Sequence, residues 1–196
     1  MRSVLNVGGH NKSHPMPEAY QGWKHLLLDI DPRLDADITM DARELSTLNG
    51  PKFDSVFCSH NLEHYYHHEV KKVLAGFLHV MADDGFAFIV VPDLEDLMAT
   101  VAEKKLDLDD VLYESRVGPI MVRDLIFGYG KEIEASGQDF YAHKTGFTRK
   151  SLVKVLKEAG FHSIYSTNAN MEIVAYAFKN RPTDYALELL SLDRMG

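Results

Sequence analysis

The sequence VLNVGG at residues 4–9 is a short apolar run that leads directly into two glycines. An apolar run of this length, closed by a turn signal, is typical of a buried strand. Gly8 and Gly9 carry no Cβ atom, so the backbone at this turn can approach a ligand closely. Ligands of open α/β sheets bind beyond the carboxyl ends of the strands. The stretch therefore predicts one edge of a binding crevice.

Acidic side chains follow the next two predicted strands. The apolar run at residues 23–30 has Asp29 at its carboxyl end, followed by Ile30. The carboxylate of Asp29 can accept hydrogen bonds from both ribose hydroxyls of a nucleoside. Residues 38–48 hold a short strand and an acidic turn, and Asp41 there stands where an adenine amino group could be met. These two carboxylates extend the predicted crevice along the sheet edge.

A further strand at residues 53–59 ends at Ser59 and leads into His60, which would line the floor of the same crevice. Residues 10–22 read mainly as loop, and residues 106–147 are less regular and rich in glycine. The other periodic segments predict helices over 62–81, 95–105, 148–159 and 184–192, and strands over 86–91, 163–167 and 172–179.

Local signals set the ends of several of these elements. Residues 83–85, Asp-Asp-Gly, are expected to break the first helix, and Thr148 and Gly160 should cap and end the third. The last two strands could form an antiparallel edge pair. Apolar strands separated by helices or loops are typical of a parallel sheet covered on both faces, so we predict an α/β fold.

Composition excludes several classes of protein. The chain has 196 residues, 45% of them hydrophobic, which suits one globular domain. A net charge of −8 and scattered basic residues argue against nucleic acid as a partner. No apolar run is long enough to span a membrane. Cys58 is the single cysteine, so an intramolecular disulfide is excluded, and we expect a cytoplasmic protein. We expect the Cys58 side chain to be buried and unreactive.

The order of these motifs resembles that of the class I S-adenosylmethionine-dependent methyltransferases, above all small bacterial members. The resemblance rests on residues 4–9, 22–32, 41–45, 53–64 and 84–93, and on 143–148 and 159–161. It implies a Rossmann-like three-layer sandwich with a mostly parallel, seven-stranded sheet and an antiparallel edge strand. It also implies one domain over residues 1–196, in which residues 95–147 cover the substrate.

The resemblance also implies the cofactor, S-adenosylmethionine, and the residues that hold it. The methionine part would face Gly8 and Gly9, and the ribose hydroxyls would meet Asp29, with Ile30 beside it. Adenine would meet Asp41 and Ala42, and the transferred methyl group would lie near Ser59 and His60. Such enzymes transfer the methyl group by direct in-line displacement, so no covalent nucleophile is needed.

Histidines are the candidate catalytic groups. A neutral imidazole at His143 could take a proton from the acceptor, or it could instead fix the covering segment or contact the substrate; His60 is a second, tentative candidate. His64 and His68 would share a helix face at metal-ligand spacing, but Glu63 and His64 are expected to make local hydrogen bonds. We therefore expect no metal.

Two departures from the family pattern leave an alternative open. The first motif lacks the usual three alternating glycines, and the first helix is shortened to residues 10–22. The chain is therefore either an enzyme that methylates a small-molecule or sugar-containing acceptor, as a monomer or homodimer, or a degenerate binding protein or partner subunit. A nicotinamide oxidoreductase is disfavoured because the Gly-x-Gly-x-x-Gly fingerprint is absent.

Overall fold

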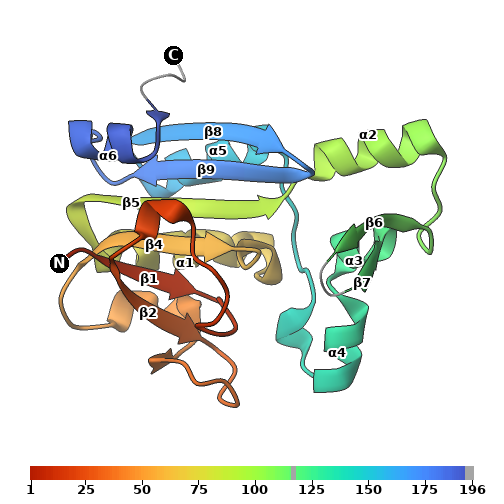
Figure 1. Cartoon of the computed structure of the whole chain (residues 1–196), viewed down its shortest axis with the longest axis horizontal. Helices are drawn as coiled ribbons and strands as arrows, with labels where there is room; N and C mark the ends of the chain where they lie inside the picture. The colour runs from red at the N-terminus through yellow and green to blue at the C-terminus, as the bar shows by residue number, and fades with distance from the viewer. Residues whose placement is uncertain (116–117, 193–196) are drawn as a thin grey trace.

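A seven-stranded sheet runs through the centre of the molecule (Figure 1). The computed structural model describes residues 1–115 and 118–192. The strand order is β3-β2-β1-β4-β5-β9-β8. The strands are β1 (Ser3–Val7), β2 (Lys24–Asp29), β3 (Ile38–Thr39), β4 (Phe53–Ser59), β5 (Met81–Pro92), β8 (Ser163–Ala169) and β9 (Glu172–Phe178).

The sheet is mostly parallel, as expected. Strands β3, β2, β1, β4 and β5 pair in parallel, whereas β9 pairs antiparallel with both β5 and β8. The last two strands thus form the antiparallel edge pair that we expected, with β8 at the edge and β9 second from it. A tight turn at Asn170 and Met171, with φ angles of 54° and 62°, joins β8 to β9 in a hairpin. Its second arm, not its first, pairs with β5.

One face of the sheet is covered by α1 (His67–Val80), α5 (Arg149–Ala159) and the 3-10 helix η2 (Ala42–Thr47). Helix α1 buries the apolar side chains that its 3.6-residue spacing brings to one side, including Leu74 and Phe77. Helix α5 begins and ends as predicted. The Thr148 side chain accepts a hydrogen bond from the Ser151 amide, and Gly160 ends the helix with a φ angle of 108°.

The opposite face is covered by shorter elements, the 3-10 helix η1 (Glu18–Tyr20) and the helix α6 (Asp184–Leu189). Residues 10–22 contain no α-helix, as expected from their prolines and polar side chains. The buried Tyr20 ring fills part of this gap by packing among aromatic side chains, and its hydroxyl meets Ser55 Oγ at 2.8 Å. Helices on both faces confirm the three-layer arrangement.

The helix that we expected over residues 62–81 is interrupted. A short 3-10 helix, η3 (Leu62–His64), comes first, and α1 begins only after Tyr65 and Tyr66, whose backbones are extended. Burial of the Tyr65 ring in the core accounts for this break. Residues 83–85 were expected to end the helix, but they lie inside β5, which begins directly at Met81. An irregular register opposite Phe53 and Ser55 accommodates them.

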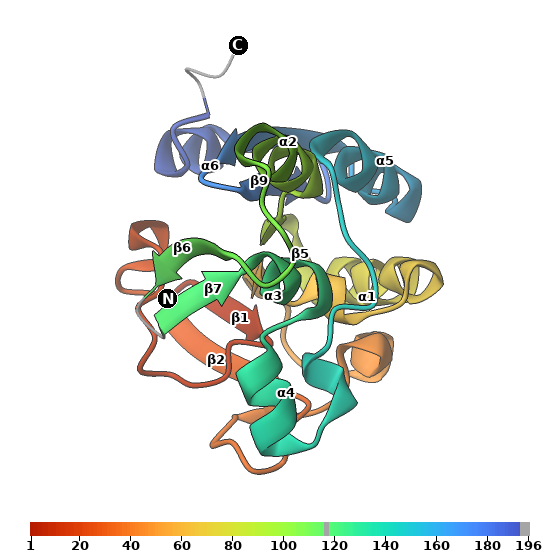
Figure 2. The same cartoon turned by 90° about the vertical axis from the view of Figure 1, so that its right-hand side faces the viewer.

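Residues 95–147, called the covering segment below, lie beyond the carboxyl ends of the parallel strands (Figures 1 and 2). They include most of α2 (Leu94–Lys104), then β6 (Val111–Ser115), β7 (Gly118–Met121), α3 (Val122–Phe127), α4 (Gly130–Ser136) and the 3-10 helix η4 (Asp139–Tyr141). A small apolar core of Leu97, Ile120, Val122 and Leu125 holds these elements together. Residues 116–117 of this segment, and residues 193–196 of the expected domain, lie outside the described residues.

No helix within residues 1–115 and 118–192 has the length and apolarity needed to cross a bilayer. Cys58 is a free, fully buried thiol on β4, and its burial raises its pKa well above the ordinary value. The expectation that it is a core side chain is confirmed.

Candidate cofactor and catalytic site

A cavity of about 460 Å³ lies between the carboxyl ends of the central strands and the covering segment. The sheet side contributes His10, Asn11, His60 and His64, and the covering segment contributes Tyr113, Leu125, Tyr129, Tyr141 and His143. A second hollow of about 420 Å³, lined by Ser3 and Lys24, lies at the opposite, amino ends of the strands. Ligands of open α/β sheets bind at the carboxyl ends, so the first cavity is the candidate site.

The glycine turn after β1 is shaped by two asparagines. Gly8 has a φ angle of 72°, and a Cβ atom there would lie 2.1 Å from Asn61 Nδ2. A Cβ atom on Gly9 would lie 2.1 Å from Asn6 Nδ2. A side chain at Gly8 would thus be strained and crowded, and one at Gly9 would displace the Asn6 side chain. Within the part of the chain that the structure describes, the buried Asn61 Oδ1 has no hydrogen-bond donor, so an acceptor stands free beside the turn.

Asp29 ends β2, as predicted, and is 7% exposed. Its carboxylate accepts the main-chain N–H of His10 at 3.1 Å and that of Asp31 at 3.0 Å. A carboxylate has about four lone-pair sites, so these two bonds leave others for a ligand. Ile30 lines a small neighbouring cavity of about 40 Å³ together with Asn61.

Asp41 and Ala42, which the sequence predicts to contact adenine, make other contacts in this structure. Asp41 caps η2, and its carboxylate accepts Arg43 Nη2 at 2.6 Å. Burial would raise the pKa of Asp41, but the Arg43 guanidinium outweighs burial and lowers it. Ala42 is buried in the core, whereas the Asp41 side chain still borders the small cavity. Their contact with adenine stays a prediction.

His60 follows Ser59 at the end of β4 and adopts a φ angle of 50°. Its Nε2 lies 2.8 Å from Glu172 Oε1, and its Nδ1 lies 3.6 Å from Glu63 Oε1. Burial would lower the pKa of His60, but hydrogen bonding to the two carboxylates raises it to about 10. A raised pKa favours the imidazolium, which has no free lone pair and does not suit a general base.

The pKa of His143 is shifted in the direction opposite to that of His60. Its Nδ1 lies 3.0 Å from the Leu125 carbonyl oxygen, so Nδ1 carries the proton and Nε2 carries the lone pair. Burial lowers the pKa of His143 and favours the neutral ring. Nε2 lies 4.0 Å from Glu63 Oε1, and the ring borders the cavity. This arrangement fits a general base better than that of His60 does.

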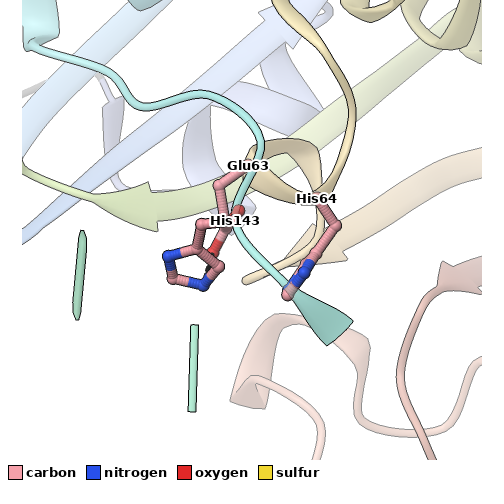
Figure 3. A group of neighbouring side chains, drawn as sticks. All are labelled: Glu63, His64 and His143. Carbon is pink, nitrogen blue, oxygen red and sulfur yellow. Dashed lines mark ion pairs between the residues drawn. The ribbon is translucent and has the colours of Figure 1, made fainter. Parts of the chain in front are cut away.

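Glu63 and His64 form, with His143, a cluster that sequence reasoning missed (Figure 3). Glu63 is 1% exposed, and neither of its carboxylate oxygens has a hydrogen-bond partner within the described ranges. The expectation of local hydrogen bonds for this side chain was therefore wrong. Burial would raise the pKa of Glu63, but the neighbouring His60 outweighs burial and lowers it, so the carboxylate is ionised.

His64 does not share a helix face with His68, because it belongs to η3 and His68 to α1. Its Nδ1 instead lies 3.2 Å from the carbonyl oxygen of Ala142, 78 residues further along the chain. The ring meets that of His143 edge-on, with centroids 4.9 Å apart. No local signal in the sequence links positions so far apart, which is why the cluster was not found.

A second contact ties the covering segment to the sheet. The Tyr141 hydroxyl donates to Asp31 Oδ2 at 2.9 Å. Asp31 is 1% exposed and also accepts hydrogen bonds from the main chain and guanidinium of Arg33. These contacts with Arg33 lower the pKa of Asp31, so its carboxylate stays charged.

No protein-family profile and no curated protein sequence matches this chain. Solved structures do. An O-methyltransferase family protein from Burkholderia thailandensis matches with a TM-score of 0.59 and 12% identity, over 93% of this chain and 52% of that one. A SAM-dependent methyltransferase from Archaeoglobus fulgidus matches with a TM-score of 0.55 and 15% identity, over 90% of this chain and 85% of that one.

A third match is the 1,6-didemethyltoxoflavin-N1-methyltransferase of Burkholderia thailandensis, solved with S-adenosylhomocysteine bound. Its TM-score is 0.52 and its identity 18%, over 92% of this chain and 72% of that one. The chain spans about half the length of the first of these proteins. The strand order and the structural matches agree: the chain has the fold of the class I S-adenosylmethionine-dependent methyltransferases.

Proposed function

We propose that the protein is an S-adenosylmethionine-dependent methyltransferase that acts on a small-molecule or sugar-containing acceptor. The observation that carries the proposal is the buried, unpaired Oδ1 of Asn61 beside the Gly8 turn. An acceptor atom buried without a donor costs free energy, and the amino groups of this cofactor are donors of the required kind. When bound, the cofactor supplies a methyl group on a positively charged sulfur.

The neighbouring strand end fits the same ligand. The lone pairs that Asp29 has left can accept the ribose hydroxyls, as the sequence predicts. Acidic side chains around the crevice suit a cationic ligand, and Asp124 and Glu132 both border the cavity. In this proposal the turn, Asn61 and Asp29 hold the cofactor, and the covering segment closes over it.

His143 is proposed as the proton acceptor. Nε2 of His143 would take the proton that the acceptor gives up when the bound cofactor supplies its methyl group. The tyrosine rings of Tyr113, Tyr129 and Tyr141 border the cavity on the acceptor's side. Rings with a polar hydroxyl suit a flat or sugar-like acceptor.

Calorimetric titration with S-adenosylmethionine and S-adenosylhomocysteine tests the proposal. We expect Asp29→Ala to weaken binding by about 1–3 kcal/mol, roughly 5- to 150-fold, because polar groups lose their partner. The control Asp35→Ala removes an exposed carboxylate from the following loop and should leave the affinity unchanged. Absence of binding by the wild-type protein would overturn the proposal, and unchanged affinity in Asp29→Ala would show that Asp29 is not the ribose ligand.

Turnover distinguishes the enzyme from the alternative of a degenerate binding protein or partner subunit. Methyl transfer to a member of an acceptor panel supports the enzyme, whereas tight cofactor binding without transfer supports the alternative. The remaining expectations, a cytoplasmic bacterial protein that works as a monomer or homodimer, are part of the proposal. Light scattering after size-exclusion chromatography measures the oligomeric state.

A further inference from the structure

We propose that Glu63, His64 and His143 bind a divalent transition-metal ion in the wall of the crevice. One ligand atom from each of the three side chains lies within 4.8 Å of the others. Glu63 and His64 come from η3, directly after β4, and His143 comes from the covering segment (Figure 3). Two nitrogen donors and one carboxylate thus converge from two distant parts of the chain.

The Glu63 carboxylate is the first argument for a cation. A charged group that is 1% exposed is normally paired and hydrogen-bonded, because burial without partners costs several kcal/mol. Both oxygens of Glu63 are unpartnered among the described residues. The nearest imidazole nitrogens, His60 Nδ1 and His143 Nε2, lie 3.6 and 4.0 Å from Glu63 Oε1, beyond hydrogen-bond distance. The cluster therefore has at its centre a buried carboxylate that, within the described residues, has an ion-pair neighbour in His60 but no hydrogen-bond donor.

The protonation of the two imidazoles is the second argument. Carbonyl oxygens accept but never donate, so the bonds to Ala142 and Leu125 place the proton of His64 and of His143 on Nδ1. With the proton on Nδ1, the lone pair of each ring is on Nε2. Metal-bound histidines characteristically use one ring nitrogen for the ion and donate the other N–H to a carbonyl or carboxylate. Both rings already have that outer partner.

The donor set indicates the kind of ion. Two imidazoles and one carboxylate suit Zn²⁺, Fe²⁺, Mn²⁺ or Co²⁺, whereas Mg²⁺ and Ca²⁺ prefer oxygen ligands. Three protein ligands leave coordination positions open, as in catalytic rather than structural sites. His64 and His143 line the crevice, so those positions face it. We therefore also infer, on the basis of the proposed function, that the ion binds an oxygen atom of the acceptor. The ion then occupies Nε2 of His143, so in the metal-bound protein the acceptor's proton passes to water and not to His143.

This inference replaces the expectation, drawn from the sequence, that the chain binds no metal. That expectation considered His64 and His68 as the pair of ligands. In the fold the two histidines belong to different helices, η3 and α1. The competing explanation is that His60 alone balances Glu63, since its ring is an imidazolium held between Glu63 and Glu172. In that case the cluster would bind no ion, and the experiment below separates the two.

Titration of the EDTA-treated full chain with Co²⁺ and Zn²⁺, without S-adenosylmethionine, tests the inference. We expect one ion per chain and visible Co²⁺ absorption bands of a site with nitrogen and oxygen ligands. Glu63→Gln and His143→Ala should each weaken binding by more than the roughly 10- to 100-fold that loss of an outer-shell partner costs. The control His67→Ala changes an exposed histidine of α1 and should bind as the wild type does.

Several results would overturn the inference. One is a wild-type chain that binds neither ion at micromolar concentration, which would leave His60 as the only counter-charge. Another is unchanged affinity in folded Glu63→Gln and His143→Ala, which would place the ion elsewhere, for example near the stacked rings of His10 and His14. Circular dichroism shows whether each variant folds. If Glu63→Gln or His143→Ala does not fold, the Co²⁺ spectrum of the wild type and the metal affinity of His64→Ala test the inference instead.

The part that concerns the acceptor has its own readout. Acetohydroxamate, a small ligand that binds metals through two oxygen atoms, should shift the Co²⁺ bands if the open positions face the crevice. An unchanged spectrum would refute that part alone. Because neither measurement uses S-adenosylmethionine, loss of metal binding and loss of cofactor binding are separate outcomes. The proposed function is tested by the calorimetric titration with the cofactor.

Discussion

Replacing Tyr141 by phenylalanine should loosen the covering segment without unfolding the sheet. The hydroxyl donates to Asp31 Oδ2 at 2.9 Å, and this is a direct side-chain bond between η4 and the turn that follows β2. Burial and the neighbouring Asp31 raise the pKa of Tyr141 to about 12, so the hydroxyl carries its proton at neutral pH and can donate.

The magnitude follows from the two partners. Hydrogen bonds to charged groups contribute about 1.5–3 kcal/mol. Asp31 keeps its bonds from Arg33 in the variant, and Tyr141 is only partly buried, so water can replace some of the lost bond. We therefore take the lower end, about 1.5 kcal/mol, which is roughly a tenfold change in the equilibrium between closed and open segment.

Hydrogen–deuterium exchange with mass spectrometry measures this equilibrium. The reporting amides are those of His143, which donates to the Phe127 carbonyl, and of Lys144 and Thr145, which donate to the Glu63 carbonyl. In Tyr141→Phe their exchange should be about tenfold faster, while that of β4 and β5 is unchanged. The control Tyr185→Phe removes an exposed hydroxyl from α6 and should change neither.

A change of less than about twofold in the exchange rates of residues 139–145 in Tyr141→Phe would refute this reasoning. The hydroxyl would then not hold the covering segment closed. Faster exchange throughout the sheet would refute it in another way, since the bond would then stabilise the whole fold.

Two further predictions concern the same end of the molecule. Gly8→Ala should lower the free energy of unfolding by at least about 1–2 kcal/mol in chemical denaturation, because the φ angle of 72° is left-handed and the new Cβ atom meets Asn61; unaltered stability would contradict the close approach. For Asp31, the folded-state pKa is lowered, so its contribution to stability is complete above the ordinary aspartate pKa of about 4 and is lost as the pH falls below it. Asp31→Asn should therefore lose less stability than the wild type between pH 5 and pH 2, and parallel curves for both proteins would disprove this role.

Much of the fold could be predicted from the sequence because its signals are local. The strands at residues 4–7 and 53–59 are apolar runs bounded by glycine or polar residues, and they lie where we expected them. Helix α5 has its cap at Thr148 and its glycine stop, so both of its ends were predicted. The position of Asp29 at the end of β2 followed from the same reasoning.

The remaining features depend on tertiary packing. The break between η3 and α1 arises because the Tyr65 ring enters the core, which helical spacing alone does not indicate. The cluster of Glu63, His64 and His143 exists only because the covering segment folds back onto η3. We expected Asp41 to be a free carboxylate at a strand end, but it forms an ion pair with Arg43. A pattern of acidic residues in the sequence does not show which of them are already paired.

The place of β9 between β5 and β8 has a consequence for how the chain is made. Until residues 172–178 have left the ribosome, β5 has an unpaired edge of largely buried apolar residues, which include Ile89 and Val91. Such an edge pairs readily with other chains. We expect shortened chains that lack β9 to aggregate during synthesis, and the full chain to complete its sheet only after that strand emerges.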